Sequence, residues 1–373
     1  MSTPHLVHVL HCLAVGGTEN GVANLINALG TEFRHTVVSM TQGGPLVGRL
    51  PAGVGIHYLG KKPGLDVRAL RRLTGLLWRL RPDVVHSRNW GAFDAVWAAR
   101  LARVPVVIHG EHGREASDPL GLNPRRNRLR RLLAPLVDRF VTVSFDLRRW
   151  LVQTVGVPGG KVLTIHNGVD TTRFSDDGRE AGRRALGLPP DRVVIGTVGR
   201  LDPVKDQMGL VEAFARLDDG RSRATLVIVG DGPCRAALEA RAGQADLAGR
   251  VKFLGEREDV PVLLMGFDVF VLPSLAEGIS NTILEAMATG LPVVATRAGG
   301  NSDLVEDGVT GILVPVAEPG ALAEALRAFL TDPHLRAIHG KAGRQRAVEE
   351  FGLERMVGRY RDLYLALACG RGA

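Results

Sequence analysis

Short, continuously apolar runs alternate with longer amphipathic segments along most of the chain. Apolar runs without polar alternation are typical of strands covered on both faces, and the longer segments repeat their apolar residues at helical spacing. In the first half the pattern predicts strands at Leu6–Leu10, His35–Met40, Ile56–Leu59, Val84–His86, Val106–Ile108, Phe140–Val143 and Val162–Ile165. It predicts helices at Thr18–Leu29, Val67–Leu80, Asp94–Leu101, Arg126–Ala134 and Phe145–Thr154. This order is that of βαβ units, which build a parallel sheet.

A polar, turn-rich segment between His166 and Gly178 interrupts this alternation. Its Asn-Gly and Asp-Asp-Gly sequences favour turns, so we place the domain linker there. Beyond it the pattern predicts strands at Val193–Val198, Ala224–Val229, Val251–Leu254, Val269–Leu272, Pro292–Thr296 and Gly311–Val314, with helices between them, after Pro319 and through Thr331–Phe351. We therefore expect two similar α/β domains, residues 1–172 and 173–349, followed by a last segment, 350–373. A cleft between two such domains is the default place for a ligand.

Composition agrees with two packed domains. The chain has 373 residues, of which 45% are hydrophobic and only 5% aromatic, and that length suits two domains of ~150–190 residues. The three cysteines, Cys12, Cys234 and Cys369, are far apart and match no metal-binding spacing. The N-terminus lacks a signal-peptide pattern, and no run approaches the ~18–20 apolar residues of a membrane span. We expect a cytoplasmic protein.

Positive charge is concentrated in the first half. Through Phe174 there are 23 Lys and Arg against 11 Asp and Glu, whereas the whole chain carries +8. The densest basic cluster consists of Arg125, Arg126, Arg128, Arg130 and Arg131. It suits an anionic lipid surface or a lipid-linked diphosphate, which would place the protein on the inner face of the membrane, but a solvated helix face explains it as well. No nucleic-acid-binding pattern accompanies the charge, so we expect no nucleic acid partner.

The first expected strand leads through Gly16, Gly17 and Thr18 into a helix. The two glycines allow close approach of a ligand, Thr18 is the expected helix cap, and the helix N-terminus offers N–H groups to a phosphate. An ordinary capped turn explains the same residues equally well. No G-x-G-x-x-G dinucleotide fingerprint follows this strand.

Two basic residues follow the first strand of the second half, Arg200 directly after it and Lys205 near a helix start. Ligands of open α/β sheets bind at this strand edge, where Arg can make a forked bond to a diphosphate and Lys supplies a point charge. Two solvated loop cations are the alternative. After the next strand, Gly230 leaves room for a base or ribose, although turn chemistry alone also accounts for it.

The most informative stretch begins at Pro273, after an expected buried strand. Gly278, Ser280 and Asn281 form a polar helix start that suits an anion. Glu277 and Glu285 bracket this start, and carboxylates are good acceptors for vicinal sugar hydroxyls. The neighbours of Glu285 are apolar, so its carboxylate needs partners.

Together these residues resemble the retaining family 4 glycosyltransferases, or glycosyl transferases group 1, over essentially the whole chain. The motifs that carry the resemblance are GGTEN, VLTIHNGVDTTRF, GRLDPVKD, VGDGP and EGISNTILEAMATGLPVVAT. The last contains the family's E-x7-E signature as Glu277 and Glu285. The resemblance implies the GT-B fold, an α/β fold of two Rossmann-like, doubly wound domains facing a cleft, with a helix at Phe351–Leu367 crossing back to the first domain. A looser resemblance, through HGEHGRE (His109–Glu115), is to sugar transferases of bacterial exopolysaccharide systems.

The family pattern implies that Arg200 and Lys205 bind the donor diphosphate, that Glu285 holds the ribose hydroxyls, and that Glu277 contacts the transferred sugar. The implied backbone cradle for the donor comprises Gly16, Gly17, Gly230, Gly278, Ile279, Ser280 and Asn281. Glu19 lies on the acceptor side. The family's catalytic His is either His109 or His112. We favour His112, because its His-Gly sequence falls near the family position, and leave His109 on the acceptor side.

The implied reaction moves a sugar from a nucleotide diphosphate donor to a glycan or lipid-linked acceptor with retention, in exopolysaccharide or cell-surface glycan synthesis. Arg200, Lys205 and a helix dipole stabilise the leaving group's charge, so we expect neither a metal nor another cofactor. Alternatives are a nucleotide-sugar epimerase, a glucan phosphorylase or a non-catalytic nucleotide-sugar binding protein. A phosphorylase needs a pyridoxal-phosphate lysine site that we do not find, and the missing glycine fingerprint disfavours a dehydrogenase.

Overall fold

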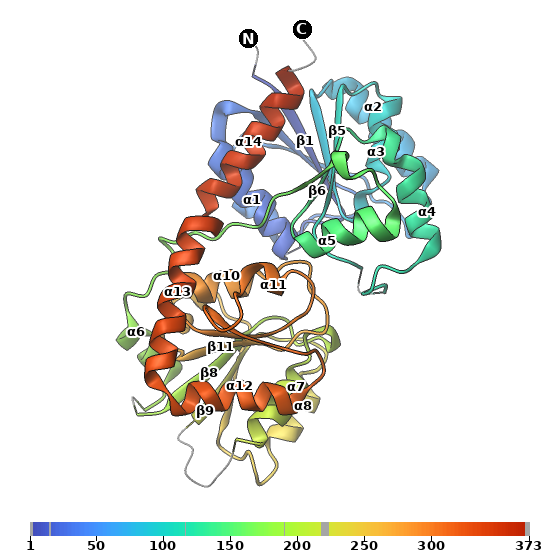
Figure 1. Ribbon diagram of the computed structural model, residues 1–373. Coiled ribbons are helices and arrows are strands. Elements are labelled where there is room, and N and C mark those ends of the chain that lie inside the picture. The colour runs from blue at the N-terminus through green and yellow to red at the C-terminus, as the bar shows by residue number, and fades with distance from the viewer. Residues whose placement is uncertain (1–2, 15, 116, 190, 218–223, 370–373) are drawn as a thin grey trace. The chain divides into compact units, whose positions relative to one another are not determined.

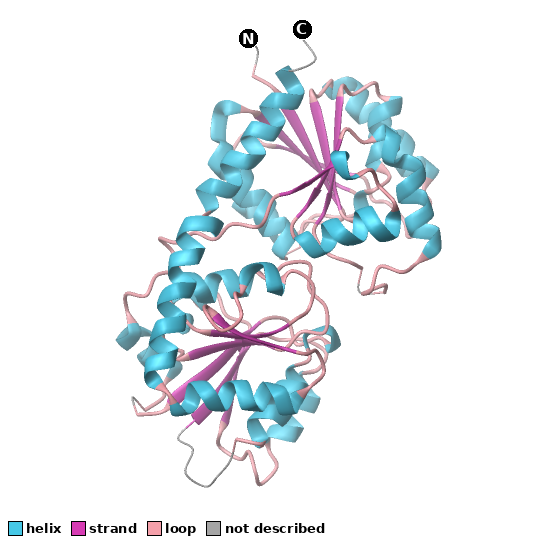
Figure 2. Ribbon diagram, viewed as in Figure 1, coloured by secondary structure: helices cyan, strands magenta, loops and turns pink. Residues whose placement is uncertain are grey.

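The computed structural model describes residues 3–14, 16–115, 117–189, 191–217 and 224–369. The chain divides into two compact units, Met1–Asn167 together with Glu354–Ala373, and Gly168–Leu353. In each unit helices cover both faces of a parallel sheet (Figures 1 and 2). Each unit is therefore a Rossmann-like α/β layer structure.

The first unit has, within its described residues, a seven-stranded sheet in the order β3-β2-β1-β4-β5-β6-β7. Its strands are β1 (His5–Leu10), β2 (Arg34–Ser39), β3 (Gly55–Tyr58), β4 (Val84–Arg88), β5 (Val106–Glu111), β6 (Arg139–Thr142) and β7 (Val162–Thr164). Its helices are α1 (Gly17–Leu29), α2 (Val67–Leu80), α3 (Ala95–Leu101), α4 (Pro124–Leu133) and α5 (Phe145–Arg149), the last continuing as a π-helix over Trp150–Val155. The central strands are buried along their whole length, as their apolar sequences predict.

The last helix, α14 (Leu353–Cys369), packs on the first unit beside α1 (Figure 1). The buried Tyr364 hydroxyl lies 2.8 Å from His86 Nδ1 of β4. At the surface Arg361 Nε donates to Glu32 at 2.6 Å. These contacts make α14 part of the layer that covers this sheet.

The second unit has a six-stranded sheet among its described residues, in the order β10-β9-β8-β11-β12-β13. Its strands are β8 (Val193–Val198), β9 (Ala224–Val229), β10 (Val251–Gly255), β11 (Val269–Leu272), β12 (Val293–Thr296) and β13 (Gly311–Val314). Its helices are α6 (Arg179–Leu186), α7 (Gln207–Ala215), α8 (Arg235–Ala242), α9 (Val260–Met265), α10 (Asn281–Ala288), α11 (Asn301–Leu304), α12 (Pro319–Thr331) and α13 (Pro333–Phe351). A hydrophobic core that includes Phe214, Leu226 and Phe329 covers one face of this sheet.

Two strands of the first unit extend further than the apolar pattern predicts. β4 continues to Arg88 and β5 to Glu111, and both residues are buried. His109 therefore lies inside a strand and not in the loop that follows it. Because side chains alternate across a strand, His109 and Glu111 share one face of β5.

Candidate active site

Two neighbouring strands of the second unit end where the predicted donor-binding loops begin. β8 and β11 pair in parallel, with Phe270 opposite Gly196. Because the carboxyl ends of parallel strands meet at one edge, the loops that follow them emerge side by side. A hydrogen bond of 2.8 Å from the Leu275 N–H to the Val204 carbonyl joins the two loops directly.

Lys205 and Glu277 form an ion pair between these loops. Lys205 Nζ lies 2.5 Å from Glu277 Oε1, and the two side chains are 27% and 8% exposed. Ser274 Oγ donates to the same oxygen at 2.7 Å, while the Ser274 carbonyl accepts from Thr296 Oγ1 at 2.5 Å. Since both contacts to Glu277 use Oε1, its second oxygen carries neither of them and can accept a hydrogen bond from a ligand hydroxyl.

Arg200 lies at the start of the loop after β8, the loop that also carries Lys205. Its side chain is 66% exposed and its guanidinium lies 3.1 Å from Asp202. Its carbonyl accepts from Gln207 Nε2 at 2.9 Å, which fixes the backbone there. An exposed pair of this kind is weak, so the guanidinium can exchange Asp202 for a diphosphate with little loss.

The loop after β11 ends at the N-terminus of α10. Ser280 is the N-cap residue and accepts from the Ile283 N–H at 3.2 Å. Ser280 is buried, and its hydroxyl also lies 3.1 Å from Thr282 Oγ1. The helix start predicted at Asn281 is thus correct, and it presents the positive end of a helix dipole at the sheet edge.

Glu285 lies one turn into α10, and its side chain is partly buried. Burial raises the pKa of Glu285 to about 7, against a smaller lowering by the Arg173 charge. A carboxylate in this setting is costly when ionised and gains from any hydroxyl or cation that a ligand supplies.

Two glycines allow the loops of this edge to pack closely. Gly230 has φ 130°, and an added Cβ would lie 2.0 Å from the Gly199 carbonyl oxygen. Gly299 has φ 51°, and its added Cβ would lie 1.8 Å from the carbonyl oxygen of Glu277. Gly230 was among the predicted site residues, whereas Gly299 was not. The Gly299-Gly300 pair after β12 is the sequence signal that could have identified it.

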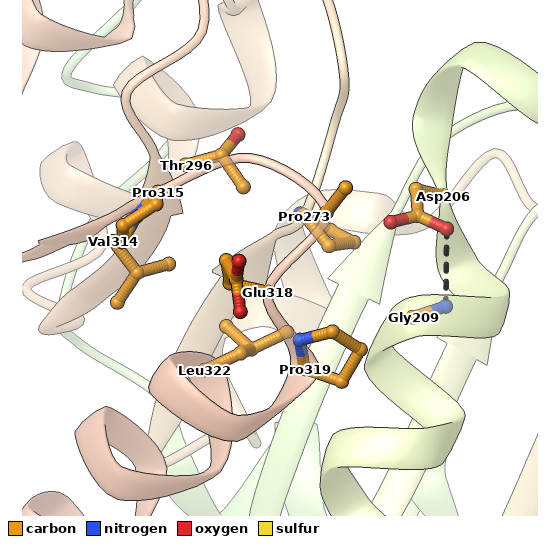
Figure 3. Close-up of a pocket in the computed structure, with 10 residues that line it drawn as sticks. Asp206, Gly209, Pro273, Thr296, Val314, Pro315, Glu318, Pro319 and Leu322 are labelled. Carbon is orange, nitrogen blue, oxygen red and sulfur yellow. Dashed lines mark hydrogen bonds between the residues drawn. The ribbon is translucent and has the colours of Figure 1, made fainter.

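A small pocket adjoins these loops, between Asp206, Pro273, Thr296 and Glu318 (Figure 3). Asp206 caps α7 there by accepting from the Gly209 N–H at 3.1 Å. The cavity volume of about 10 Å³ leaves room for about one water molecule. It is too small for any part of a nucleotide sugar.

In the first unit α1 begins at Gly17, with Gly16 as the N-cap residue and without a side-chain cap. The predicted cap by Thr18 is therefore wrong. Thr18 lies inside the helix, where its hydroxyl faces Asn89 Nδ2 at 3.4 Å. Glu19 folds back over Gly16, since an added Cβ there would lie 2.5 Å from Glu19 Oε2, and burial raises the pKa of Glu19.

His112 follows β5, and its ring lies over Gly110. An added Cβ at Gly110 would be 2.8 Å from His112 Nε2. Burial lowers the pKa of His112 to about 3, the Arg88 charge adds to this effect, and Glu111 opposes it. His112 is therefore neutral at physiological pH, and a hydrogen bond is what it can offer a ligand.

His109 is fully buried. Its Nδ1 lies 2.8 Å from Ser87 Oγ, and its Nε2 lies 3.4 Å from Glu111 Oε1. Burial of the whole ring argues against the acceptor contact predicted for His109, because the strand β5 carries this side chain into the interior. Its contacts with Ser87 and Glu111 indicate that His109 helps to hold Glu111 in place.

The arginine cluster is not one exposed patch. Arg130 is buried, lies 2.6 Å from Glu111 and stacks between Trp90 and Trp150 at 4.9 and 5.0 Å from the ring centroids. Burial alone would raise the pKa of Glu111, but Arg130 and His109 outweigh it and lower the pKa to about 2. The predicted membrane contact by Arg130 is thus wrong, because this guanidinium neutralises an interior carboxylate.

Arg125, Arg128 and Arg131 are exposed and Arg126 is partly buried. Arg131 is already engaged, since its Nε donates to the Val155 carbonyl at 2.7 Å. Three leucines around α4 are also exposed, Leu120, Leu122 and Leu132, at 69%, 61% and 67%. The face that remains is smaller and more apolar than the sequence predicts.

Asn89, directly after β4, was not singled out from the sequence. It adopts φ 57° and ψ 171°, a conformation that costs a residue other than glycine ~1–3 kcal/mol. Its Oδ1 accepts from the His112 N–H at 2.7 Å, and its own N–H donates to the Gly110 carbonyl at 2.8 Å. The positive φ cannot be read from the sequence, because glycine is the residue type that adopts this conformation freely.

Across the part of the chain that the structure describes, no group of three or more His, Cys, Asp or Glu side chains is arranged to hold a metal ion. Nor does that part contain a helix of the length and apolarity needed to span a bilayer.

Two Rossmann-like parallel-sheet units in one chain, the second with the loops of Lys205 and Glu277 at the carboxyl edge of its sheet, are the architecture of the GT-B fold. Residues 178–346 match the family described as "Glycosyl transferases group 1", and residues 15–173 match "Glycosyltransferase Family 4". The chain belongs to this family and is a glycosyltransferase. The resemblance inferred from the sequence motifs is thereby confirmed, and the match disfavours the epimerase and binding-protein alternatives.

Two curated relatives show the extent of the likeness. The chain is 31% identical over 315 residues to an Escherichia coli UDP-Gal:alpha-D-GlcNAc-diphosphoundecaprenol alpha-1,3-galactosyltransferase, covering 82% of this chain and 81% of that protein. It is 35% identical over 305 residues to a D-inositol 3-phosphate glycosyltransferase of Geodermatophilus obscurus, covering 77% and 67%.

Solved structures agree on the fold. The structure of Anabaena Alr3699/HepE in complex with UDP and glucose is similar with a TM-score of 0.84 at 22% identity, over 96% of this chain and 98% of that one. WaaG, a glycosyltransferase involved in lipopolysaccharide biosynthesis, is similar with a TM-score of 0.77 at 18% identity, over 96% and 99%. The predicted GT-B fold is confirmed.

Proposed function

We propose that this glycosyltransferase moves a hexosyl group from a UDP-sugar to a glycan or lipid-linked acceptor, with retention at the anomeric carbon. The observation that carries the proposal is the Lys205–Glu277 ion pair at the sheet edge of the second unit, where the loop after β8 meets the loop before α10. A cation and a carboxylate fixed at one point can serve the diphosphate and the sugar of one donor.

In this proposal the second unit holds the donor. Arg200 and Lys205 bind the diphosphate, and the N-terminus of α10, from Gly278 through Asn281, adds its dipole. Glu285 accepts from the ribose hydroxyls, which lowers its pKa on binding. Gly230, with no side chain, lets the loop after β9 pack against Gly199, and we place the base or ribose against its backbone.

The transfer step depends on stabilising the negative charge that develops on the leaving diphosphate. As the bond between the anomeric carbon and the diphosphate oxygen lengthens, negative charge grows on the leaving group, and Arg200 and Lys205 stabilise it. The acceptor hydroxyl attacks from the same face, and its proton passes to the leaving phosphate oxygen, which gives retention. Two cations and a helix dipole supply the stabilisation, so the proposal includes no metal or other cofactor.

The first unit contributes the acceptor side and one sugar contact. Neutral His112 hydrogen-bonds the transferred sugar and takes no part in acid–base chemistry. Gly16 and Gly17 allow close approach at the start of α1, and Glu19 lies next to the acceptor. The raised pKa of Glu19 suits a carboxyl that is shielded from water until a ligand arrives.

The choice of a UDP-sugar and of a lipid-linked acceptor draws on relatives. The Escherichia coli relative is named for UDP-galactose and a diphosphoundecaprenol acceptor, and the Anabaena structure holds UDP and glucose. An acceptor on a lipid diphosphate would bring the enzyme to an anionic membrane on its cytoplasmic side. A role in exopolysaccharide or cell-surface glycan synthesis follows from that acceptor class.

For the membrane contact we propose the exposed face of α4. Arg125, Arg128 and Leu132 follow one another at spacings of three and four residues and so share one helix face, with Leu122 just before it. Exposed apolar and basic residues on one face favour the headgroup region of an anionic bilayer. Arg125→Ser with Arg128→Ser should weaken co-sedimentation with anionic vesicles in a salt-sensitive way, and Arg103→Ser should not. Equal sedimentation of both proteins would refute the contact.

The enzymatic proposal is tested by a turnover screen of UDP-, GDP-, ADP- and dTDP-hexoses, with and without a lipid-diphosphate acceptor. Release of UDP from a UDP-hexose, and a product with the donor's anomeric configuration by NMR, are the expected results. Turnover confined to another nucleotide, or an inverted product, would contradict the proposal.

A further inference from the structure

We propose that Asn89 is a positioning residue of the transfer site, which holds the His112 backbone so that the His112 ring meets the transferred sugar. The inference rests on the proposed function, because it takes the sugar contact of His112 from there. It adds a residue that touches neither donor nor acceptor.

The backbone of Asn89 is the first argument. At φ 57° and ψ 171° a side chain is unfavourable, whereas glycine adopts this conformation freely. A residue with a side chain persists in this conformation only where its contacts offset the backbone strain. Asn89 is partly buried at the carboxyl end of β4, the edge of the sheet where ligands of this fold class bind.

The contacts of Asn89 are the second argument. Its Oδ1 accepts from the His112 N–H at 2.7 Å, and its own N–H donates to the Gly110 carbonyl at 2.8 Å. Its Nδ2 faces Thr18 Oγ1 at 3.4 Å, in the first turn of α1. One side chain thus connects the end of β4, the segment after β5 and the start of α1.

The state of His112 is the third argument. Its Nε2 is buried and has no hydrogen-bond partner among the described residues. The ring lies against Gly110, where an added Cβ would come within 2.8 Å of that nitrogen. Nε2 is thus closed off from a ligand, and the exposed part of the partly buried His112 side chain is what can face a sugar. Because the ring has this fixed place, a shift of the His112 backbone would move the whole ring relative to the sugar.

The test compares Asn89→Gly with Asn89→Asp. Glycine removes the side chain and the strain together, so the melting temperature should stay at or above that of the wild type. A misplacement of about 1 Å can cost on the order of 100-fold in rate, and we expect kcat/KM for UDP-hexose to fall roughly 10- to 100-fold. Affinity for UDP alone should stay within about twofold, because the second unit binds the nucleotide. Asn89→Asp keeps an oxygen that accepts from His112 and should restore most of the rate.

The double variant separates positioning from general structure. If Asn89 acts through His112, Asn89→Gly should reduce the rate of His112→Ala by no more than about twofold, since residues that act as a unit are not additive. Arg103→Gly is the matched control, because Arg103 is exposed and also has φ 57°. It should leave the rate unchanged.

A rate for Asn89→Gly within twofold of the wild type, in an enzyme that His112→Ala impairs, would overturn the inference and leave the proposed function standing. Additive losses in the double variant would overturn it as well. A wild-type protein that turns over no nucleotide hexose, or a His112→Ala variant with full activity, would reject the proposed function or its sugar contact, and the inference with it.

Discussion

Lys205 Nζ and Glu277 Oε1 lie 2.5 Å apart, although 72 positions separate the two residues in the sequence. The pairing of β8 with β11 brings them together, since the loops after these strands leave the sheet at one edge. Nearly all of the Glu277 side chain is buried, so the ion pair fixes the loop and holds the Lys205 ammonium group at the site.

Removing Lys205 should therefore affect stability as well as activity. Lys205→Met leaves a largely buried carboxylate with Ser274 as a remaining partner, and we expect a loss of ~1–2 kcal/mol in the free energy of unfolding. The double variant Lys205→Met with Glu277→Gln should lose less than the sum of the single variants, because the buried charge is gone. Urea unfolding of the four proteins measures this coupling, and strict additivity would show that the two side chains do not interact.

Glu285 should make donor binding depend on pH. Its pKa is about 7 in the folded protein against 4.5 for an exposed Glu. Ribose hydroxyls that donate to Glu285 favour its ionised form, so binding of UDP-glucose, whose phosphates do not titrate near neutral pH, should release a proton from this carboxyl. We expect affinity to rise with pH up to about 7 and calorimetry in buffers of different ionisation enthalpy to detect the released proton.

The raised pKa of Glu285 also predicts how the free energy of unfolding changes with pH. Between pH 4.5 and about 7 the folded protein holds a proton that the unfolded chain has lost, so this contribution is present below pH 4.5 and is lost as pH rises through 7. Glu285→Gln should remove this loss together with the proton release. A variant that binds UDP-glucose with unchanged pH dependence would contradict the assignment of Glu285.

Gly299 should be needed for the position of Glu277. Gly299→Ala places a Cβ 1.8 Å from the Glu277 carbonyl oxygen at φ 51°, so the loop must shift. Gly308→Ala is the control, with φ 76° and open space around the added Cβ, and should cost only the ~1–2 kcal/mol of backbone strain. We expect Gly299→Ala to be the less stable of the two in thermal unfolding and to lose donor turnover. Equal stability and activity would show that the loop tolerates the contact.

Arg130 should be a determinant of stability and not of membrane contact. Arg130→Ala leaves Glu111 buried without its guanidinium partner and with His109 as a remaining contact, which we expect to cost ~3–5 kcal/mol. Arg128→Ala on the surface should stay within about 0.5 kcal/mol. Because the pKa of Glu111 is about 2 when folded, the stability it provides is present above pH 4.5 and is lost as pH falls toward 2. Acid unfolding curves of the two variants decide this, and similar curves would contradict the interior ion pair.

The sequence predicts the strands best where they are wholly apolar. Both ends of β11, which is wholly apolar, are predicted correctly. Both ends of β8 and β9 are also correct, because each largely apolar run stops at a glycine, Gly199 or Gly230. β4 and β5 are predicted too short, because they end in Arg88 and Glu111. Polar residues at a strand end look exposed in a sequence, and only the partners that the fold supplies make their burial possible.

The candidate site shows the same limit. The residue types at Lys205, Glu277 and Glu285 indicate sugar-nucleotide chemistry, but the strand order that brings Lys205 to Glu277 is a property of the folded sheet. Arg130 was misjudged because its partner, Glu111, is distant in the sequence and carries no local signal. Asn89 was missed because its backbone conformation and its contact with His112 exist only in the folded unit.

The most direct test of the account is the steady-state turnover of a UDP-hexose by the wild type, Lys205→Ala and the control Arg297→Ala, whose side chain is 51% exposed. We predict that Lys205→Ala remains folded and lowers kcat by ~10²–10³, because a preorganised cation facing the leaving diphosphate is lost, while the control keeps its full rate. A folded Lys205→Ala protein with kcat within threefold of the wild type would contradict the account.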